Sequence, residues 1–295
     1  MSTASEQDDT SAAPTAPRSY LFVPGDRPER YAKALASGAD AVIIDLEDAV
    51  APHAKAIARD ALRDAWAELR SSARILVRMT AVGAATSEDD LALLADLAPR
   101  RVLVPKTEHA HELIRVRDAL APETKLLPMI ESARGWQNLE SITGAAGVER
   151  LVFGSFDFQA DLGMDTEHEV DLLPVRLAIV AHSRLADLDA PVDGVTLATD
   201  DEVRVRDDAA LARRLGFSGK LCIHPRQVAA VHAAFAPSAR ELAWAERILE
   251  AASSARGGAV MLDGRMIDRP IVLRAQRMLA RQASNIPRST TEEAP

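Results

Sequence analysis

Eight short apolar runs alternate with amphipathic helical stretches, and this alternation constrains the fold more than any other feature of the chain. The runs are nearly continuous in Val, Ile and Leu, which is typical of strands in a parallel sheet buried on both faces. The expected strands cover residues 19–23, 41–46, 74–79, 101–105, 125–130, 150–153, 191–197 and 219–223. The expected helices cover 28–37, 55–69, 87–97, 108–120, 172–186 and 201–215, with a weaker helical pattern over 132–146. Eight β/α units in about 220 residues predict a (β/α)8 TIM barrel.

The loop sequences favour this barrel over an open doubly wound sheet. An open dinucleotide-binding sheet would carry G-x-G-x-x-G after an early strand. The first expected strand instead runs into VPGDRP, and neither that fingerprint nor a Walker-type phosphate loop occurs in the chain.

Composition and charge exclude several classes of protein. The chain has 295 residues, of which 47% are hydrophobic, so it can bury the core of one barrel-sized domain or two ordinary ones. The net charge is −9 and no basic stripe is visible, so we expect no nucleic-acid partner. Every apolar stretch is far shorter than the roughly 20 residues that span a bilayer, so we expect no membrane contact. The single Cys222 excludes an internal disulfide and indicates a cytoplasmic protein, with this thiol in the core.

The two ends of the chain differ from its middle. Residues 1–17 are polar and acidic and lack the features of a signal peptide, so they are expected to form a disordered arm. We expect the barrel to cover residues 18–235, a C-terminal helix and lid segment to cover 236–283, and a flexible tail to follow over 284–295.

Two acidic residues directly follow buried apolar runs. Glu131 comes after the run 125–130, and Asp157 comes after the run 150–153. In a parallel barrel both would stand at the C-terminal mouth, where the active sites of this fold lie. Mg²⁺ takes a few hard oxygen ligands and keeps positions for water and substrate, so the pair predicts a Mg²⁺ site. Each acid alone could instead cap a following helix.

Polar residues also follow the other expected strands, and the barrel predicts that they converge on the same mouth. They are Asp45, Glu47 and Asp48 after the second strand, Arg78 at the close of the third, Lys106 after the fourth, Asp161 after the sixth and His224 after the eighth. Arg78 and Lys106 are either cations facing an anionic substrate or edge residues whose stems cover apolar surface. The three acids after the second strand cannot all face one centre, so some of them cap helices or orient neighbours. Asp157 and Asp161 are expected in a loop bounded by glycines.

These pieces form an ordered set of motifs over roughly residues 18–283. The motifs are 21–25 (LFVPG), 45–50 (DLEDAV), 77–78 (VR), 104–106 (VPK), 129–135 (MIESARG), 153–163 (FGSFDFQADLG), 193–195 (DGV), 216–225 (GFSGKLCIHP) and 263–270 (DGRMIDRP). The chain resembles the citrate lyase β-subunit family of acyl-CoA-dependent carbon–carbon lyases, in the HpcH/HpaI aldolase/citrate lyase superfamily. The resemblance implies a Mg²⁺-dependent lyase that cleaves a malyl-, citramalyl- or citryl-CoA-like 3-hydroxyacyl-CoA to a short acyl-CoA and a 2-oxoacid.

The same resemblance implies roles for individual residues. Glu131 and Asp157 would bind Mg²⁺, and Arg78 would contact the 2-oxoacid or the thioester oxygen. Asp45 and Glu47 would hold waters and orient the metal ligands. Substrate or CoA contacts are assigned to Lys106, Pro24, Gly25 and Arg27. Asp268 would transfer a proton at the acetyl carbon from a lid that covers a neighbouring subunit's site, which implies a homotrimer.

Three positions depart from the family pattern. Met79-Thr80 stands where Ile or Val and Asn are usual, residues 81–90 lack an expected aromatic, and Phe156 replaces a common acid. These departures predict a changed substrate rather than a changed reaction class.

Three other functions remain open from the sequence. They are an aldolase acting on free 2-oxo-4-hydroxy acids, a malyl-CoA-type thioesterase, and a β subunit that works only in a citrate lyase complex.

Overall fold

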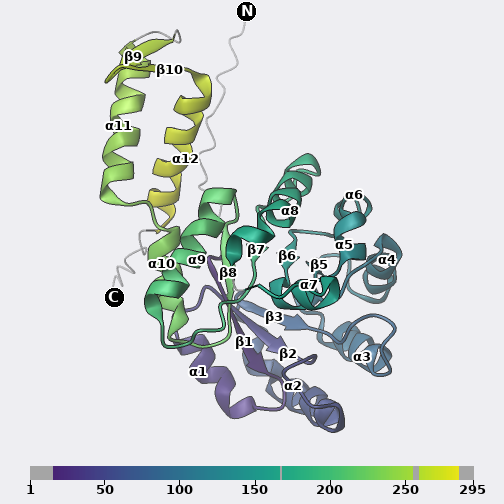
Figure 1. The fold of residues 1–295 in the computed structure, drawn as a ribbon. Coiled ribbons are helices and arrows are strands. Elements are labelled where there is room, and N and C mark those ends of the chain that lie inside the picture. The colour runs from purple at the N-terminus through teal and green to yellow at the C-terminus, as the bar shows by residue number, and fades with distance from the viewer. Residues whose placement is uncertain (1–15, 167, 255–258, 286–295) are drawn as a thin grey trace, which may run out of the picture. The chain divides into compact units, whose positions relative to one another are not determined.

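The computed structural model describes residues 16–166, 168–254 and 259–285. The chain divides into two compact units, one of residues 17–235 and one that contains the described residues from 236 onward (Figure 1). Most of the expected N-terminal arm and C-terminal tail lies outside the described residues. None of the described helices is long and apolar enough to cross a membrane.

Residues 17–235 form a closed parallel barrel, which confirms the expected TIM-barrel fold. The sheet runs in order from β1 to β8, and β8 closes it by pairing with β1. The strands are β1 Ser19–Pro24, β2 Ala41–Asp45, β3 Ile75–Arg78, β4 Arg101–Val104, β5 Lys125–Ile130, β6 Val152–Phe153, β7 Val192–Asp193 and β8 Gly219–Cys222. The expected strand over 191–197 was too long, because ladder pairing in β7 involves only residues 192 and 193.

Helices follow the strands and cover the outside of the barrel (Figure 1). A short 3-10 turn, Pro28–Arg30, precedes α1 Tyr31–Ala36, and another, Pro52–Ala54, precedes α2. The later barrel helices are α2 Lys55–Leu69, α3 Ser87–Leu97, α4 Ala110–Ala119, α5 Ala133–Gln137, α6 Leu139–Thr143, α7 Ser155–Leu162, α8 Leu173–Leu185, α9 Glu202–Leu215 and α10 Gln227–Phe235. The weak helical segment over 132–146 is two short helices, divided at Asn138.

The expectation of a loop around Asp157 and Asp161 was wrong, because these residues lie on helix α7. Gly154 accepts the N–H of Phe158 at the start of the helix, and Gly163 ends it with a left-handed φ of 65°. The flanking glycines therefore mark the two ends of a short helix. Phe158 points inward and is buried, which anchors α7 on the barrel.

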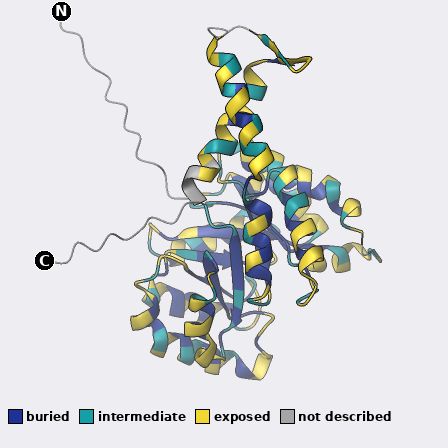
Figure 2. Ribbon diagram, turned by 90° about the vertical axis from the view of Figure 1, so that its left-hand side faces the viewer, coloured by how far each residue is buried: buried dark blue, intermediate teal, exposed yellow. Residues whose placement is uncertain are grey.

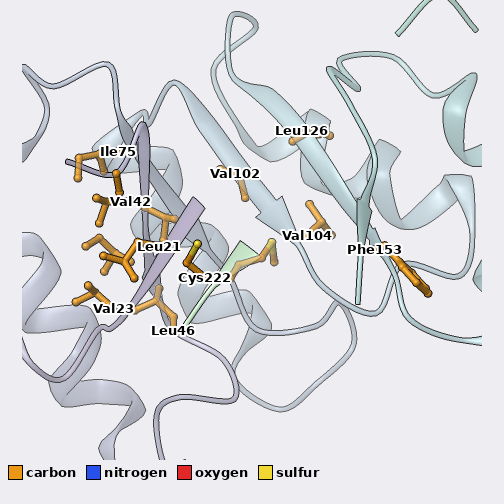
Figure 3. Packing of buried hydrophobic residues seen from close by; sticks show 14 of the residues in the cluster. Leu21, Val23, Val42, Leu46, Ile75, Val102, Val104, Leu126, Phe153 and Cys222 are labelled. Carbon is orange, nitrogen blue, oxygen red and sulfur yellow. The ribbon is translucent and has the colours of Figure 1, made fainter. Parts of the chain in front are cut away.

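The hydrophobic core has two layers. The inner layer contains only strand residues and fills the barrel, with Tyr20, Ile43, Leu76, Leu103, Leu127, Val152, Val192 and Leu221 among its members. The outer layer lies between strands and helices, and Figure 3 shows residues from both sequence halves packed there. The strands are therefore buried on both faces, while the helices keep exposed outer faces (Figure 2). Cys222 is fully buried in the outer layer, and burial raises its pKa to about 12, which confirms its assignment to the core.

The second unit is a helical hairpin. Helices α11 Ala239–Ser254 and α12 Arg269–Asn285 pack together around a small cluster that includes Ala245, Ile248 and Ala275. Between them lies a two-stranded antiparallel hairpin, β9 Val260–Leu262 and β10 Arg265–Ile267.

A polar cluster joins β1, β2 and α10 at the N-terminal ends of the strands. The Asp40 carboxylate accepts a hydrogen bond from Arg18 Nε at 2.9 Å and lies 3.4 Å from His232 Nε2. The same imidazole nitrogen lies 2.8 Å from Ser19 Oγ. In a catalytic Ser–His–Asp triad, one ring nitrogen of the histidine contacts the serine and the other contacts the aspartate. Here Nε2 of His232 contacts both, so this cluster is structural.

We expect Asp40→Asn to lower the free energy of unfolding by about 1–2 kcal/mol near neutral pH. Burial alone would raise the pKa of Asp40, but the hydrogen bonds from His232 and Arg18 outweigh burial and hold it below 3.8. The stabilisation is therefore present above the unfolded-state value and is lost as pH falls toward the folded-state value. Urea unfolding at about pH 7 and about pH 3 should show the difference shrink in acid. Asp60→Asn, an exposed acid on α2, is the matched control, and an acid-independent difference would contradict this account.

Candidate active site

Arg78 ends β3 and is held between two carboxylates from the end of β2. Its Nε and Nη2 donate to the two oxygens of Asp45 at 2.6 and 2.5 Å, and its Nη1 lies 3.1 Å from Glu47 Oε2. The guanidinium also lies 4.6 Å from the ring centroid of Phe22. Burial would lower the pKa of Arg78, but the two carboxylates raise it, so this cation is permanent and fixed in orientation.

Asp45 has no free oxygen for another ligand. Besides the arginine, it accepts the backbone N–H of Glu47 at 2.9 Å and of Ala49 at 3.0 Å. These bonds shape the turn after β2 and place Glu47 beside Arg78. Burial raises the pKa of Glu47, and the charges of Arg78 and Lys106 oppose that rise.

Lys106 connects this ion cluster to Glu131. Its Nζ lies 2.6 Å from Glu47 Oε1 and 3.1 Å from Asp48 Oδ2, and its backbone N–H donates to Glu131 Oε1 at 3.0 Å. Burial would lower the pKa of Lys106, but its two acidic partners raise it. The residue has a left-handed φ of 49°, an unfavourable conformation for a side chain with a Cβ, and this turn directs its N–H at the glutamate.

Glu131 is 2% exposed and has one unpaired oxygen. Its Oε2 has no hydrogen-bond partner among the described residues. The pKa of Glu131 is raised to about 8. Burial is the main cause and the charge of Asp157 adds to it, whereas the hydrogen bond from the Lys106 backbone lowers the pKa. Gly154 packs directly on the side chain, since an added Cβ would lie 2.4 Å from Glu131 Cγ.

Helix α7 brings Asp157 to the same place. Asp157 lies in the first turn of α7, is exposed, and lines a cavity of about 220 Å³ together with Arg78 and Asp45. One helical turn later, Asp161 accepts the N–H of Ala133 at 2.8 Å. This bond ties α7 to the segment that follows Glu131, so the two acids are held on connected elements.

The free oxygens suit a divalent cation. The carboxylates of Asp45 and Glu47 are occupied by Arg78, Lys106 and backbone donors, whereas Glu131 Oε2 is buried and unpaired. An unpaired buried carboxylate oxygen is costly unless a cation or water meets it. The described residues contain no group of three or more His, Cys, Asp or Glu arranged for a metal. A cation held by Glu131 and Asp157 would therefore keep positions for water and substrate.

The cavity beside these acids has a largely apolar wall. Its apolar side chains are Phe22, Met129, Phe156, Val195, Leu221 and Ile223. They lie on or just after four strands, β1, β5, β7 and β8, and on α7, so only the closed barrel assembles this wall.

Other expected site residues contact the local backbone or are exposed. Gly25 donates its N–H to Asp45 O at 2.8 Å, and an added Cβ would lie 2.8 Å from that oxygen, so the loop after Pro24 packs against β2. Arg27 is exposed. The ring of His224 accepts the N–H of Arg226 in the turn after β8.

Asp268 belongs to the second unit. It is exposed and caps the start of α12, where its side chain accepts the N–H of Ile271 at 3.4 Å. Its role at the barrel mouth, like the CoA contacts of Pro24, Gly25 and Arg27, stays a prediction.

Two residues of the site were not expected from the sequence. Phe22 lies under the Arg78 guanidinium, and Gly154 lets the α7 start approach Glu131. Strand alternation could have placed Phe22 on the inner face with Tyr20, but nothing local indicates the contact of Gly154.

A parallel eight-stranded barrel with fixed acids and an arginine at its C-terminal mouth defines a TIM-barrel enzyme. Residues 18–225 match the family described as HpcH/HpaI aldolase/citrate lyase, a group of lyases and aldolases. The chain belongs to this family, and the resemblance drawn from its motifs is confirmed.

Similar proteins cover nearly the whole chain. A citrate lyase subunit beta-like protein of Mycobacterium tuberculosis is 38% identical over 272 residues, which are 89% of this chain and 94% of that protein. A (3S)-malyl-CoA thioesterase of Cereibacter sphaeroides is 32% identical over 90% of this chain and 94% of its own length. The crystal structure of protein CitE from M. tuberculosis with magnesium, acetoacetate and coenzyme A has a TM-score of 0.81 at 36% identity, covering 91% of this chain and 98% of that one.

We expect the metal-free protein to lose stability as pH rises, and Glu131→Gln to remove much of this loss. The folded-state pKa of Glu131, about 8, lies above its ordinary value of 4.5, so the folded state holds a proton that the unfolded chain releases between these values. Stability contributed by this group is therefore present at low pH and lost as pH rises through the window. Thermal unfolding in EDTA from about pH 5.5 to 8.5 should lower Tm by roughly 5 °C more in the wild type than in the variant. Glu140→Gln, an exposed acid on α6, is the control, and equal slopes in all three proteins would refute the assignment.

Proposed function

We propose that this chain is a Mg²⁺-dependent CoA-ester lyase that cleaves a 3-hydroxyacyl-CoA between C2 and C3. The products would be a short acyl-CoA and a 2-oxoacid. The observation that carries the proposal is the unpaired, buried Oε2 of Glu131 near Asp157, at a mouth where Arg78 is fixed. The magnesium and coenzyme A in the similar CitE structure support the same reading.

The reaction breaks the O–H bond of the hydroxyl and the C2–C3 bond, and it moves negative charge from the hydroxyl oxygen to the thioester oxygen. The substrate hydroxyl loses its proton to a base, and the O–H electron pair forms the new carbonyl at C3. The electron pair of the broken C2–C3 bond moves into the thioester enolate. Mg²⁺ held by Glu131 and Asp157 would supply Lewis acidity at the hydroxyl oxygen.

Arg78 stabilises the negative charge on the thioester oxygen in this proposal. Asp45 and Glu47 hold the guanidinium before the substrate arrives, so little reorganisation is needed as the enolate forms. Lys106 keeps Glu47 in place and positions Glu131 through its backbone N–H.

Asp268 completes the proton balance. It would donate a proton to C2 of the enolate, so that one proton leaves the hydroxyl and one enters at carbon. The family resemblance assigns this acid to a lid over a neighbouring subunit's site in a homotrimer. A lid would also exclude water from the enolate.

We expect Glu131→Gln and Asp157→Asn each to lower kcat/KM by at least about 100-fold and to weaken Mg²⁺ binding. The purified full chain should be tested with malyl-CoA, citramalyl-CoA, β-methylmalyl-CoA and citryl-CoA, with Mg²⁺ or EDTA, and the products followed by mass spectrometry. Mg²⁺ titration by calorimetry gives a second readout that does not need turnover. Wild-type activity and Mg²⁺ affinity in either variant would sink the metal-site proposal.

Asp268→Asn should lower kcat about 100-fold while leaving Mg²⁺ affinity unchanged, because it removes an acid and not a metal ligand. Asp263→Asn is a matched control on the same hairpin, since Asp263 pairs with Arg247 at its surface and has a φ of 48° that Asn tolerates. Mixed oligomers of Asp268→Asn and Glu131→Gln chains should regain activity if the acid serves a neighbouring subunit. Full activity of the Asp268→Asn protein alone would exclude the proton-transfer role.

Hydrolysis of the thioester is a second candidate function. The 32% identity to a (3S)-malyl-CoA thioesterase over 90% of the chain favours it. The same product analysis separates the two reactions, since hydrolysis gives free CoA and an intact hydroxyacid whereas cleavage gives an acyl-CoA and a 2-oxoacid.

A further inference from the structure

Phe156 stands at the boundary between two cavities. It lines the cavity of about 220 Å³ beside Arg78 and Asp157, and it also lines a second cavity of about 260 Å³. It directly precedes Asp157 on α7 and keeps 37% of its surface exposed, which is unusual for a large aromatic residue. The side chain therefore borders both the candidate site and the second cavity.

The side chains that line the first cavity include more acids than cations. Among the described residues that line it, Arg78 is the only cation, and it already faces the carboxylates of Asp45 and Glu47. Asp157 and Asp48, which pairs with Lys106, add two further acids to the lining. One substrate carboxylate can be met by Arg78 and a cation on Glu131 and Asp157, but a second one would meet acids or the apolar wall. Burying an unpaired carboxylate against such a wall is strongly unfavourable.

Phe156 belongs to the apolar wall of the first cavity, and its place beside Asp157 indicates which part of the substrate contacts it. If Asp157 holds the cation that binds the substrate hydroxyl, the carbon that bears the hydroxyl lies next to residue 156. The substituent on that carbon then points at the ring or past it toward the second cavity, which Leu172, Leu197 and Ala198 help to line.

We infer that Phe156 is a specificity-determining residue. The variable substituent on the carbinol carbon of the substrate is then hydrogen or a small alkyl group, and not a group that bears a second carboxylate. The acid released is then a monocarboxylic 2-oxoacid. This inference rests on the proposed function and narrows its substrate class.

Three CoA esters that differ only in this substituent test the inference. The carbinol carbon bears hydrogen in malyl-CoA, methyl in citramalyl-CoA and carboxymethyl in citryl-CoA. With the full-length wild type and Mg²⁺, we expect kcat/KM for citryl-CoA to be at least about 100-fold below that for the better of the other two. Citryl-CoA turnover within about threefold of the better ester would overturn the inference.

Variants of Phe156 test the residue itself. Phe156→Ala joins the two cavities, so it should raise kcat/KM for an ethyl-substituted ester relative to citramalyl-CoA by about tenfold. Leu162→Ala removes an exposed side chain from the same helix that lines neither cavity, and it should leave this ratio unchanged. An unchanged ratio in Phe156→Ala would show that the ring does not select the substituent.

Binding of free 2-oxoacids tests the inference without turnover. Calorimetric titration of the Mg²⁺-loaded wild type should give a lower Kd for pyruvate than for oxaloacetate, which has the added carboxylate. If no CoA ester is cleaved, the proposed reaction fails, and the order of these two affinities still decides the inference. Tighter binding of oxaloacetate, or no binding of either acid, would overturn it.

Discussion

The structure depends on the pairing of β8 with β1, which closes the sheet. Tyr20 and Leu21 pair with Leu221 and Cys222, so residues about two hundred positions apart become neighbours. Closure buries both faces of every strand, and it removes the edges that would otherwise be unpaired. It also collects the C-terminal ends of all eight strands in one ring. Every contact of the candidate site follows from this ring, because its charged residues come from different strands and from α7.

Burial of charge in that ring has to be compensated locally. Arg78 is paired by Asp45 and Glu47, and Lys106 by Glu47 and Asp48. One oxygen of Glu131 is left without a hydrogen-bond partner among the described residues. This leftover acceptor is what makes the mouth a candidate cation site rather than a closed ion network. The apolar wall that includes Phe156 raises the cost of any further unpaired charge, which links the architecture of the site to the choice of substrate.

Much of the fold could be predicted because strand and helix patterns are local. The boundaries of α2 and α3 match the sequence expectation residue for residue, since each has a regular apolar face. Helix α7 was missed because it is short and bounded by glycines, and its stability comes from Phe158 packing on the barrel. The expected strand over 191–197 was too long because apolar composition cannot tell how many residues find ladder partners.

The sequence by itself determined the alternation of strands and helices, the family, and the acids and cations that follow the strands, because each depends on short segments. Only the tertiary structure decided which of those charges neutralise one another. It showed that Asp45 accepts hydrogen bonds from Arg78. It also showed that Lys106, in a left-handed conformation, donates its backbone N–H to Glu131. It also placed Phe156 between two cavities. These outcomes depend on distances between segments far apart in the chain, and no local pattern encodes such distances.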